Sequence, residues 1–528
     1  MEYFYFLGAD SLILQLFMKC LFRILFIAFL WVQAPCDAQI KNIQICQNCA
    51  SEDLSMVIQP NNPNLLLCAA NAGFYFSSDT GHTWVLQKLS CEKRKKYAQP
   101  FALWYEQHSY FSYVKGKDTN MISVHPAQIS PTGHDCFAVK RTPGKVINGL
   151  KIFADKKTKS LGAVWSQRDS SQNKIKTDSS FIFYSFCYLP GSGWTNPERI
   201  SAFNGDSSRG ESALMGLDAC LGLNSEVYVA WAGSKGLVFR NLADQKSKTE
   251  KTVAPFVNGR QYVVGEKNVS NGLPTIACDQ SNGPFRGRVY ICWSDEKHGK
   301  HDKNVFIIYS DDQGDNWTEP ILVTYNPNHK EQFMPSMTID QRDGTLYILY
   351  YDQQNYLAGS AADLYLAQSK NGGLKFEYYK INEQPIQAHR QLSFGKSVGL
   401  SAVNGIVSPL WMQADSKKKI NLFTALIDEP ALLNYAKSRT AELGIKKTFH
   451  YSEKIKIDFT LKKATRFSAV LTKPLEAGFE KIILKNKKLK PGQHSFVINS
   501  KKLGLRKDNY TLILYYDNTN THAWILQE

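Results

Sequence analysis

Apolar, strand-like segments recur along the middle of the chain at a nearly constant spacing. Each is entered by a small residue or proline and is often followed by Asp, and the last four are 61 or 62 residues apart. The seven segments are centred near Val57, Ala102, Ile152, Gly216, Ala277, Thr338 and Leu400. A period of this length indicates a repeat architecture in which every unit forms one supersecondary element.

The hydrophobic pattern inside a unit predicts four strands. Residues Arg288 to Trp293 and Asn304 to Ser310 alternate and are rich in β-branched and aromatic side chains, which is typical of half-buried strands. A polar loop separates them, and a turn then leads to an outer strand. The second strand of five units ends at a large aromatic residue: Trp165, Trp231, Trp293, Tyr350 or Trp411. Four strands in this order are typical of a propeller blade.

A sequence motif marks the turn before the outer strand. In Ser-x-Asp-x-Gly-x-x-Trp, the Asp can accept hydrogen bonds from backbone N–H groups, the Gly supplies an unusual backbone angle, and the Trp anchors the turn. Two good copies and one degenerate copy occur, at Ser77, Asp79, Gly81 and Trp84, at Ser310, Asp312, Gly314 and Trp317, and at Ser369, Asn371, Gly372 and Phe376. The motif resembles the Asp-box of the bacterial neuraminidase repeat, and the chain resembles the sialidase-like β-propeller superfamily. We expect Asp79 and Asp312 to be structural.

The predicted fold is therefore all-β, with a seven-bladed propeller over residues 39–429. A six-bladed ring is the alternative, because catalytic sialidases have six blades and the second unit is poorly patterned. The seventh unit, Val398 to Ile427, supplies only three strands. Residues Ile40 to Cys46 could supply the fourth and close the ring, which removes an exposed sheet edge.

Residues 430–528 differ in texture from the repeats. A short helical stretch from Pro430 to Leu443 precedes alternating strands, which predicts an immunoglobulin-like β-sandwich. Residues 431–528 hold 16 Lys and 3 Arg against 8 acids, so they carry +11 of the chain's formal charge of +16. The lysines alternate with apolar residues, which favours a solvated face, and we expect no nucleic-acid partner. Leu489-x-Pro-Gly-x-His has a weak resemblance to the sandwich of type IX secretion sorting and hook-capping proteins, which implies a role in secretion or anchoring.

The first 38 residues predict export. Lys19 and Arg23 precede an apolar run that ends near Ala38, which is the pattern of a signal peptide over residues 1–38. We expect a secreted or cell-surface protein, with the periplasm as an alternative. Nine cysteines follow. Cys278 and Cys292 should face each other across a hairpin, and Cys46-x-x-Cys49 predicts a local disulfide or two free thiols rather than a metal site.

Candidate chemistry lies in the loops opposite the marked turns, where Tyr, His, Gln and carboxylate groups suit sugar binding. The candidate catalytic carboxylates are Asp295, Glu296, Asp352 and Glu106, and the candidate ligand-binding residues are Arg168, His298, Tyr356 and Arg390. Asp295 with Asp302, or Asp352 with Asp363, could hold a structural cation, although pinning of the loops is the simpler role. We expect no other cofactor and no metal at the spaced pair His298 and His301.

The resemblance also implies a test for hydrolysis. Catalytic sialidases hold the substrate carboxylate with three arginines, and the first of these lies in an Arg-Ile-Pro motif. This sequence contains no Arg-Ile-Pro motif. Phe394-Gly395-Lys396 resembles a segment of secreted, non-catalytic members, with Lys396 in place of an acid. The leading hypothesis is a monomeric surface propeller that binds a glycan or a cell-surface protein. An exo-sialidase-like glycoside hydrolase is the alternative, and a purely structural protein is the third.

Overall fold

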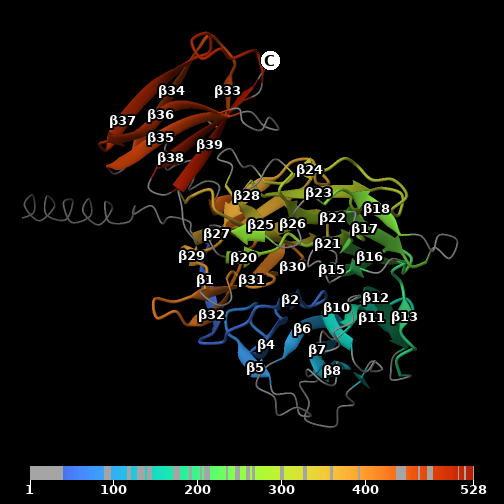
Figure 1. Ribbon diagram of the computed structural model, residues 1–528. Coiled ribbons are helices and arrows are strands. Elements are labelled where there is room, and N and C mark those ends of the chain that lie inside the picture. The colour runs from blue at the N-terminus through green and yellow to red at the C-terminus, as the bar shows by residue number, and fades with distance from the viewer. Residues whose placement is uncertain are drawn as a thin grey trace, which may run out of the picture. The chain divides into compact units, whose positions relative to one another are not determined.

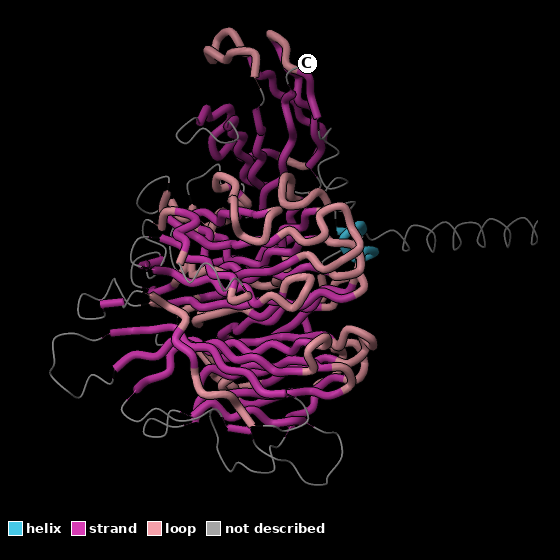
Figure 2. The backbone as a smooth tube through the Cα atoms, turned by 90° about the vertical axis from the view of Figure 1, so that its right-hand side faces the viewer, coloured by secondary structure: helices cyan, strands magenta, loops and turns pink. Residues whose placement is uncertain are grey.

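The computed structural model describes most of the chain between residues 40 and 526. The described ranges are 40–87, 97–115, 121–127, 137–138, 145–169, 179–188, 193–202, 205–206, 214–233, 236–243, 250–256, 262–264, 268–297, 302–324, 330–356, 361–389, 393–435, 448–461, 464–472, 480–508, 510–516 and 519–526. The regular structure of these residues is almost entirely β-strand, joined by turns and loops, with one short helix at 429–435 (Figure 2). None of the helices in the described part is long and apolar enough to span a membrane. The expected signal peptide, residues 1–38, lies outside the described residues.

The described part of residues 40–427 contains seven antiparallel sheets of four or five strands, numbered here in chain order (Figure 1). Sheets 1 to 4 consist of β2 (Leu54–Ile58), β3 (Leu66–Ala70), β4 (Gly73–Ser77) and β5 (Val85–Gln87); β6 (Ala98–Tyr105), β7 (His108–Lys115), β8 (Met121–Ala127) and β9 (Phe137–Ala138); β10 (Lys145–Asp155), β11 (Ser160–Asp169), β12 (Ser179–Tyr188) and β13 (Glu198–Arg199), with β14 (Gly205–Asp206) beside β12; and β15 (Met215–Leu221), β16 (Val227–Gly233), β17 (Gly236–Asn241) and β18 (Lys251–Ala254).

The remaining sheets repeat the same strand order. Sheets 5 to 7 consist of β21 (Thr275–Cys278), β22 (Val289–Asp295), β23 (Asn304–Ser310) and β24 (Ile321–Leu322); β25 (Gln332–Asp340), β26 (Thr345–Asp352), β27 (Ala361–Ser369) and β28 (Glu377–Lys380), with β29 (Ile386–Gln387) beside β27; and β30 (Gly399–Val403), β31 (Ile406–Ala414), β32 (Ile420–Ala425) and β1 (Asn42–Cys46). A small hairpin of β19 (Tyr262–Val264) and β20 (Asn268–Ser270) precedes sheet 5.

The first strands of the sheets lie against one another in sequence. Each contacts the first strand of the next sheet, from β2 through β6, β10, β15, β21 and β25 to β30, and β30 contacts β2. The predicted segment centres all fall in these strands. As the sequence predicts, the N-terminal strand β1 completes sheet 7, where it pairs antiparallel with β32 (Figure 1). The contacts therefore return to their starting point.

Alternation of strand direction gives the sheets two ends. Turns that join first to second and third to fourth strands lie at one end, called here the turn face. Loops that join second to third strands, and the links between sheets, lie at the other end, called the loop face. The predicted aromatic residues of the second strands are buried, with at most 2% of each side chain exposed, at Trp165, Trp231, Trp293, Tyr350 and Trp411. Large aromatic side chains from the second strands of sheets 3 to 7 thus fill the layers between sheets.

The marked turns of sheets 1, 5 and 6 share one hydrogen-bond pattern. In sheet 5, Ser310 Oγ donates to Asp312 Oδ1 (2.7 Å) and accepts from the Gly314 N–H (2.8 Å), and Asp312 Oδ1 accepts the Asn316 N–H (2.8 Å). The Trp317 indole N–H closes the turn on the Gly314 carbonyl oxygen at 3.0 Å. Gly314 has a φ of 98°, a conformation that favours glycine.

The degenerate turn of sheet 6 keeps this geometry and corrects one assignment. Ser369 Oγ donates to Asn371 Oδ1 (3.0 Å) and accepts the N–H of Gly373, not Gly372, at 2.9 Å. Gly373, with a φ of 86°, therefore occupies the position of Gly314. The assignment of Gly372 was wrong by one residue, since the spacing of Ser310 and Gly314 applied to Ser369 leads to Gly373.

The cysteines give one expected and one unexpected result. Cys46 and Cys49 form a disulfide, which agrees with one of the two roles predicted for this pair. The prediction for Cys278 and Cys292 is wrong, because Cys278 pairs with Val289 and Cys292 pairs with Thr275. The Asp279 N–H donates to the Arg288 carbonyl oxygen, and the Gly287 N–H donates to the Asp279 carbonyl oxygen. These bonds make the turn between the two cysteines asymmetric and shift the register of the strands.

Side chains at the ends of first strands connect neighbouring sheets on the turn face. Asp340 ends β25 in sheet 6, and its carboxylate accepts the N–H groups of Asn404 and Gly405 in the first turn of sheet 7. Gln59 reaches in the same way from sheet 1 to the Glu106 carbonyl oxygen of sheet 2 (2.9 Å). These contacts join sheet 6 to sheet 7 and sheet 1 to sheet 2 in addition to the apolar layers.

The first prediction tests this connection. We expect Asp340→Ala to lower the free energy of unfolding by about 2 kcal/mol or more, because a buried carboxylate is lost and two N–H groups of another sheet lose their acceptor. Asp415 accepts two N–H groups within its own loop, from Lys417 and Lys419. Chemical denaturation should show a loss below about 1 kcal/mol for Asp415→Ala, and equal losses would contradict a specific role between sheets.

The chain after residue 447 forms a separate pair of sheets. One has the order β33 (Thr448–His450), β39 (Thr519–Leu526), β38 (Tyr510–Tyr516), β35 (Thr465–Thr472) and β36 (Glu480–Leu489), and the other pairs β34 (Lys454–Leu461) with β37 (Gly492–Asn499). Along β34 the side chains alternate between exposed and buried, and Ile455, Ile457, Phe459 and Leu461 form part of a core with β35 and β38. The exposed positions of β34 include Lys454 and Lys456, so lysines occupy the outer face of this strand.

Candidate functional site

Polar and charged side chains concentrate on the loop face of sheets 5 and 6. The group, called here the loop-face cluster, contains Asp295, Glu296, Asp302, Lys303, Glu331, Gln332, Asp352, Asp363, Lys380 and Asn382. Most members are buried, which is unusual for charged residues unless they are paired. Most charged groups of the cluster are paired with one another, whereas one atom each of Asp352 and Gln332 has no hydrogen-bond partner.

Lys303 lies at the centre of the part contributed by sheet 5. Its side chain is fully buried, and its ammonium group lies 2.8 Å from Glu296 Oε1 and 2.6 Å from Glu331 Oε1. Glu296 follows β22 and Glu331 precedes β25, so one lysine connects two sheets. The Gln332 N–H also donates to the Lys303 carbonyl oxygen (2.9 Å). The candidate catalytic residue Glu296 is thus engaged in an internal ion pair.

Asp295 and Asp302 hold their own loop. The Asp295 carboxylate accepts the Glu296 N–H (2.8 Å), and Asp302 accepts from the Asn304 side-chain amide (2.9 Å). Both aspartates are buried. Among the described residues, no group of three or more His, Cys, Asp or Glu side chains could hold a metal ion. These hydrogen bonds correspond to the pinning role that was the simpler of the two sequence predictions.

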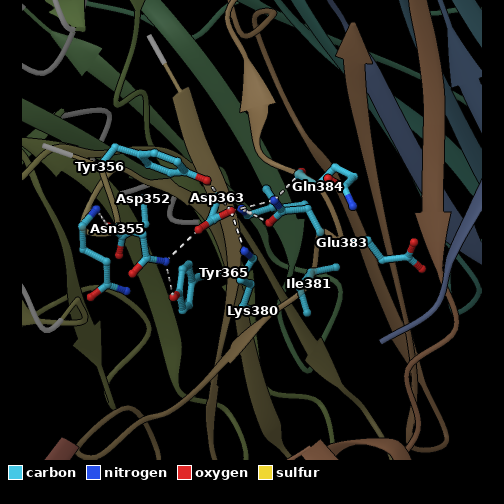
Figure 3. Close-up of polar contacts among 12 residues, drawn as sticks. Asp352, Asn355, Tyr356, Asp363, Tyr365, Lys380, Ile381, Glu383 and Gln384 are labelled. Carbon is cyan, nitrogen blue, oxygen red and sulfur yellow. Dashed lines mark hydrogen bonds and ion pairs between the residues drawn. The ribbon is translucent and has the colours of Figure 1, made fainter. Parts of the chain in front are cut away.

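Asp363 holds the loop that follows β26 (Figure 3). Its carboxylate accepts hydrogen bonds from Tyr356 Oη (2.9 Å), Asn355 Nδ2 (2.7 Å) and Asn382 Nδ2 (2.8 Å), and it pairs with Lys380 Nζ at 3.0 Å. Burial and the neighbouring Asp363 charge raise the pKa of the Tyr356 phenol well above its usual value. Because both carboxylate oxygens have donors and a countercharge, Asp363 is a poor cation ligand, and pinning explains it better.

Unlike its neighbour Asp363, Asp352 makes no ion pair with any residue that the structure describes. It ends β26, is 1% exposed, and accepts the Gln354 N–H (2.7 Å) and the Gln332 side-chain amide (3.2 Å) at Oδ1. Burial raises the pKa of its carboxyl group to about 7, and the charge of Asp363 adds to the rise. At neutral pH, Asp352 can therefore exist as a carboxylic acid.

The other predicted residues are scattered. Glu106 lies in the turn between β6 and β7, on the turn face, because first and second strands meet at that end. The structure therefore does not bring it together with Asp295, Glu296 and Asp352. Arg168 lies near the loop-face end of β11, with its side chain outside the described part. His298, His301 and Arg390 lie outside the described residues.

Sequence reasoning missed half of the cluster. It did not select Lys303, Glu331, Gln332, Lys380 or Asn382, because each reads as an ordinary solvated residue beside a strand. One signal was available for Lys303 and Gln332. Lys303 directly precedes an apolar strand, and Gln332 begins one. A polar side chain there must be buried and must therefore have a partner.

Five arginines between residues 40 and 427 have described side chains, and all of them contact turns or outer strands. Arg288 makes a bidentate pair with Asp311 (2.7 and 2.8 Å), and Arg342 pairs with Asp343 (2.8 Å). Arg199, Arg240 and Arg286 bond to backbone carbonyl oxygens. None of these five guanidinium groups belongs to the loop-face cluster, so the described arginines do not form a carboxylate-binding triad there.

Comparison with known proteins yields matches to solved structures only. No protein-family model matches the chain, and no curated protein matches it. The alpha-L-arabinanase of Penicillium chrysogenum in complex with arabinobiose is 12% identical, with 59% of this chain and 93% of that chain covered and a TM-score of 0.39. The phage phi92 endosialidase is 11% identical (74% and 69% covered, TM-score 0.40), and the Trypanosoma rangeli sialidase in complex with the inhibitor DANA is 10% identical (92% and 89%, TM-score 0.39). At these values the matches assign neither a family nor an active site.

Proposed function

We propose that this protein is a secreted or surface-attached, seven-bladed Asp-box β-propeller that binds a glycan or a protein ligand at its loop face. The circuit of first-strand contacts and the completion of sheet 7 by β1 support seven blades rather than six. The marked turns lie on the turn face, as expected for scaffold elements. The sandwich of residues 430–528 would then act in secretion or anchoring.

One observation favours binding over hydrolysis. A glycoside hydrolase needs two carboxyl groups that flank one bond of the substrate, about 5 Å apart in a retaining enzyme and about 6.5–9.5 Å apart in an inverting one. Asp295, Glu296 and Asp352 are instead buried and bonded within the cluster, and Glu106 lies at the opposite end of its sheet. A substrate would have to displace internal partners before it could reach them.

Tyr356 is the described loop-face residue best suited to contact a ligand. Its ring is half-buried and its hydroxyl group is fixed by Asp363, so it offers an aromatic surface at low entropic cost. The half-buried amide of Asn355 lies in the same loop and is bonded to Asp363. Aromatic rings beside amides are a common surface for sugars.

The alternative function is an exo-sialidase-like glycoside hydrolase, which the raised pKa of Asp352 favours. A carboxyl group with a pKa of about 7 is suited to act as a general acid. Turnover of a fluorogenic sialoside that is abolished by Asp295→Asn or Asp352→Asn would establish this alternative over the binding function.

The second prediction tests binding directly. We expect the purified protein to bind a defined set of glycans on an array, and we expect Tyr356→Ala to weaken that binding about tenfold, which corresponds to one stacking contact. Leu374→Ala is the matched control, because Leu374 is bulky, 59% exposed, and located in a turn-face segment. Equal binding by both variants would place the ligand elsewhere, and a protein ligand would appear as capture from cell-surface extracts without any glycan signal.

A further inference from the structure

Asp352 occupies a central position among three neighbouring strands of sheet 6. Its register partners are Gln332 on β25 and Asp363 on β27. Their side chains are 1%, 0% and 0% exposed, so solvent does not reach the group in the structure. Every hydrogen-bonding atom here therefore depends on a partner within the protein or on a buried proton.

Two atoms of this group have no partner. Asp352 Oδ1 accepts from Gln354 and from Gln332 Nε2, but Asp352 Oδ2 and Gln332 Oε1 have no hydrogen-bond donor. Both atoms are acceptors, and they belong to two groups that already face each other through the Nε2–Oδ1 bond. Two buried acceptors without a donor cost free energy, whereas a single added proton can satisfy both.

The surrounding charges do not favour ionisation of Asp352. Asp363 is paired with Lys380 on β28, and beyond Gln332 the Glu331 carboxylate is paired with Lys303. Among the described residues, the other ionisable neighbours are phenols, Tyr350 on β26 and Tyr356 in the following loop, whose pKa values the Asp352 charge raises further. An ionised Asp352 would thus be a second buried negative charge beside Asp363.

We propose that Asp352 carries a proton on Oδ2 in the folded protein, donates it to Gln332 Oε1, and thereby ties the loop-face ends of β25 and β26 together in a pH-dependent manner. The protonated carboxyl group satisfies both orphan acceptors and leaves Oδ1 free to hold the Gln354 N–H. Loss of the proton restores the two unpaired acceptors and adds repulsion toward Asp363, which itself anchors Asn355 and Tyr356. The Gln354 N–H bond to Oδ1 persists, because an ionised carboxylate accepts it at least as well, so deprotonation breaks the Asp352–Gln332 link and adds repulsion at the Asp363 anchor. This device concerns the protein itself and requires no ligand.

The sign of the pH dependence follows from the direction of the shift. The folded protein holds the proton up to a pH of about 7, whereas the unfolded chain releases it near the ordinary value of 3.8. Between these two values, folding takes up a proton, so stability falls as the pH rises. The contribution is fully present below the unfolded value and is lost above about 7.

The third prediction measures this contribution. Denaturant unfolding of the full protein from pH 4.5 to 8.5 should show that its folding equilibrium constant falls, relative to Asp352→Asn, by up to about tenfold per pH unit between pH 5 and 7 and no further above pH 7.5. Asparagine has nearly the same shape and supplies an N–H donor to Gln332 Oε1 at every pH. Asp458→Asn, at a carboxylate that is 63% exposed, should follow the unsubstituted protein. Parallel curves for the unsubstituted protein and Asp352→Asn would overturn the proposal.

Infrared spectroscopy provides a second measurement that does not depend on the folding of Asp352→Asn. A carboxylic-acid carbonyl band should be present at pH 6, disappear with a midpoint near pH 7, and shift in Gln332→Met, because that variant removes the acceptor of the O–H group. A spectrum without this band at pH 6, or a band that Gln332→Met leaves unchanged, would show that Asp352 is ionised or bonded elsewhere.

Discussion

Replacement of Lys303 by alanine should lower the free energy of unfolding by about 3–5 kcal/mol, one of the two largest losses expected for any single change in this protein. The lysine is fully buried and holds Glu296 and Glu331 at 2.8 and 2.6 Å. Its removal leaves two buried carboxylates without their shared cation, on segments that belong to different sheets. Denaturant unfolding monitored by tryptophan fluorescence measures the loss.

Two further variants separate the buried charge from lost volume. Lys370→Ala removes a lysine that is 61% exposed and paired with Glu429, and it should cost less than about 1 kcal/mol. Combining Lys303→Met with Glu296→Gln and Glu331→Gln removes all three charges and should recover much of the loss. If the triple variant is as unstable as Lys303→Ala, packing rather than charge would account for the effect.

Asp363→Ala should destabilise the protein to a similar extent, by about 3–5 kcal/mol. The substitution leaves Lys380 without its partner and removes the acceptor for Tyr356, Asn355 and Asn382 (Figure 3). The pKa of the Tyr356 phenol should fall toward its ordinary value, because the neighbouring negative charge is a cause of its rise. Spectrophotometric titration of tyrosine ionisation and denaturant unfolding measure the two effects.

A control at an exposed aspartate tests whether the loss of stability depends on the buried position of Asp363. Asp458→Ala removes a carboxylate that is 63% exposed and paired only with Lys456, so its cost should be within about 0.5 kcal/mol. A loss for Asp363→Ala no greater than that of Asp458→Ala would mean that the loop after β26 does not depend on the carboxylate.

The repeated elements of the fold were predictable because each is encoded locally. The spacing of 61 or 62 residues located the first strands, and the aromatic residues at Trp231 and Trp293 located the second. Even the pairing of β1 with β32 could be predicted, because a three-stranded unit leaves an edge that another strand must cover. An alternating strand pattern or a fixed turn motif lies within one short segment of the sequence. Each strand or turn can therefore be located from that segment alone.

The site was less predictable, because its members come together from separate segments. Lys303, Glu331 and Lys380 have no distinguishing pattern, and their partners lie far away in sequence. Glu106 was grouped with carboxylates of the opposite face, although the strand order alone places it in a first turn. The register of Cys278 depended on hydrogen bonds within an irregular turn. Sequence thus located the strands, whereas the pairing of buried charges required three-dimensional contacts.

The pairing of β1 with β32 has a consequence for how the chain acquires its structure. Asn42 and Ala425 are register partners, although they are separated by nearly the whole repeat region. Contacts between such distant residues form slowly, because a long loop must close first. During synthesis, β1 must wait without a partner until the ribosome has released β32. The last sheet is therefore expected to assemble late in translation, and until then its unfinished edge is the part of the nascent protein most in need of a chaperone.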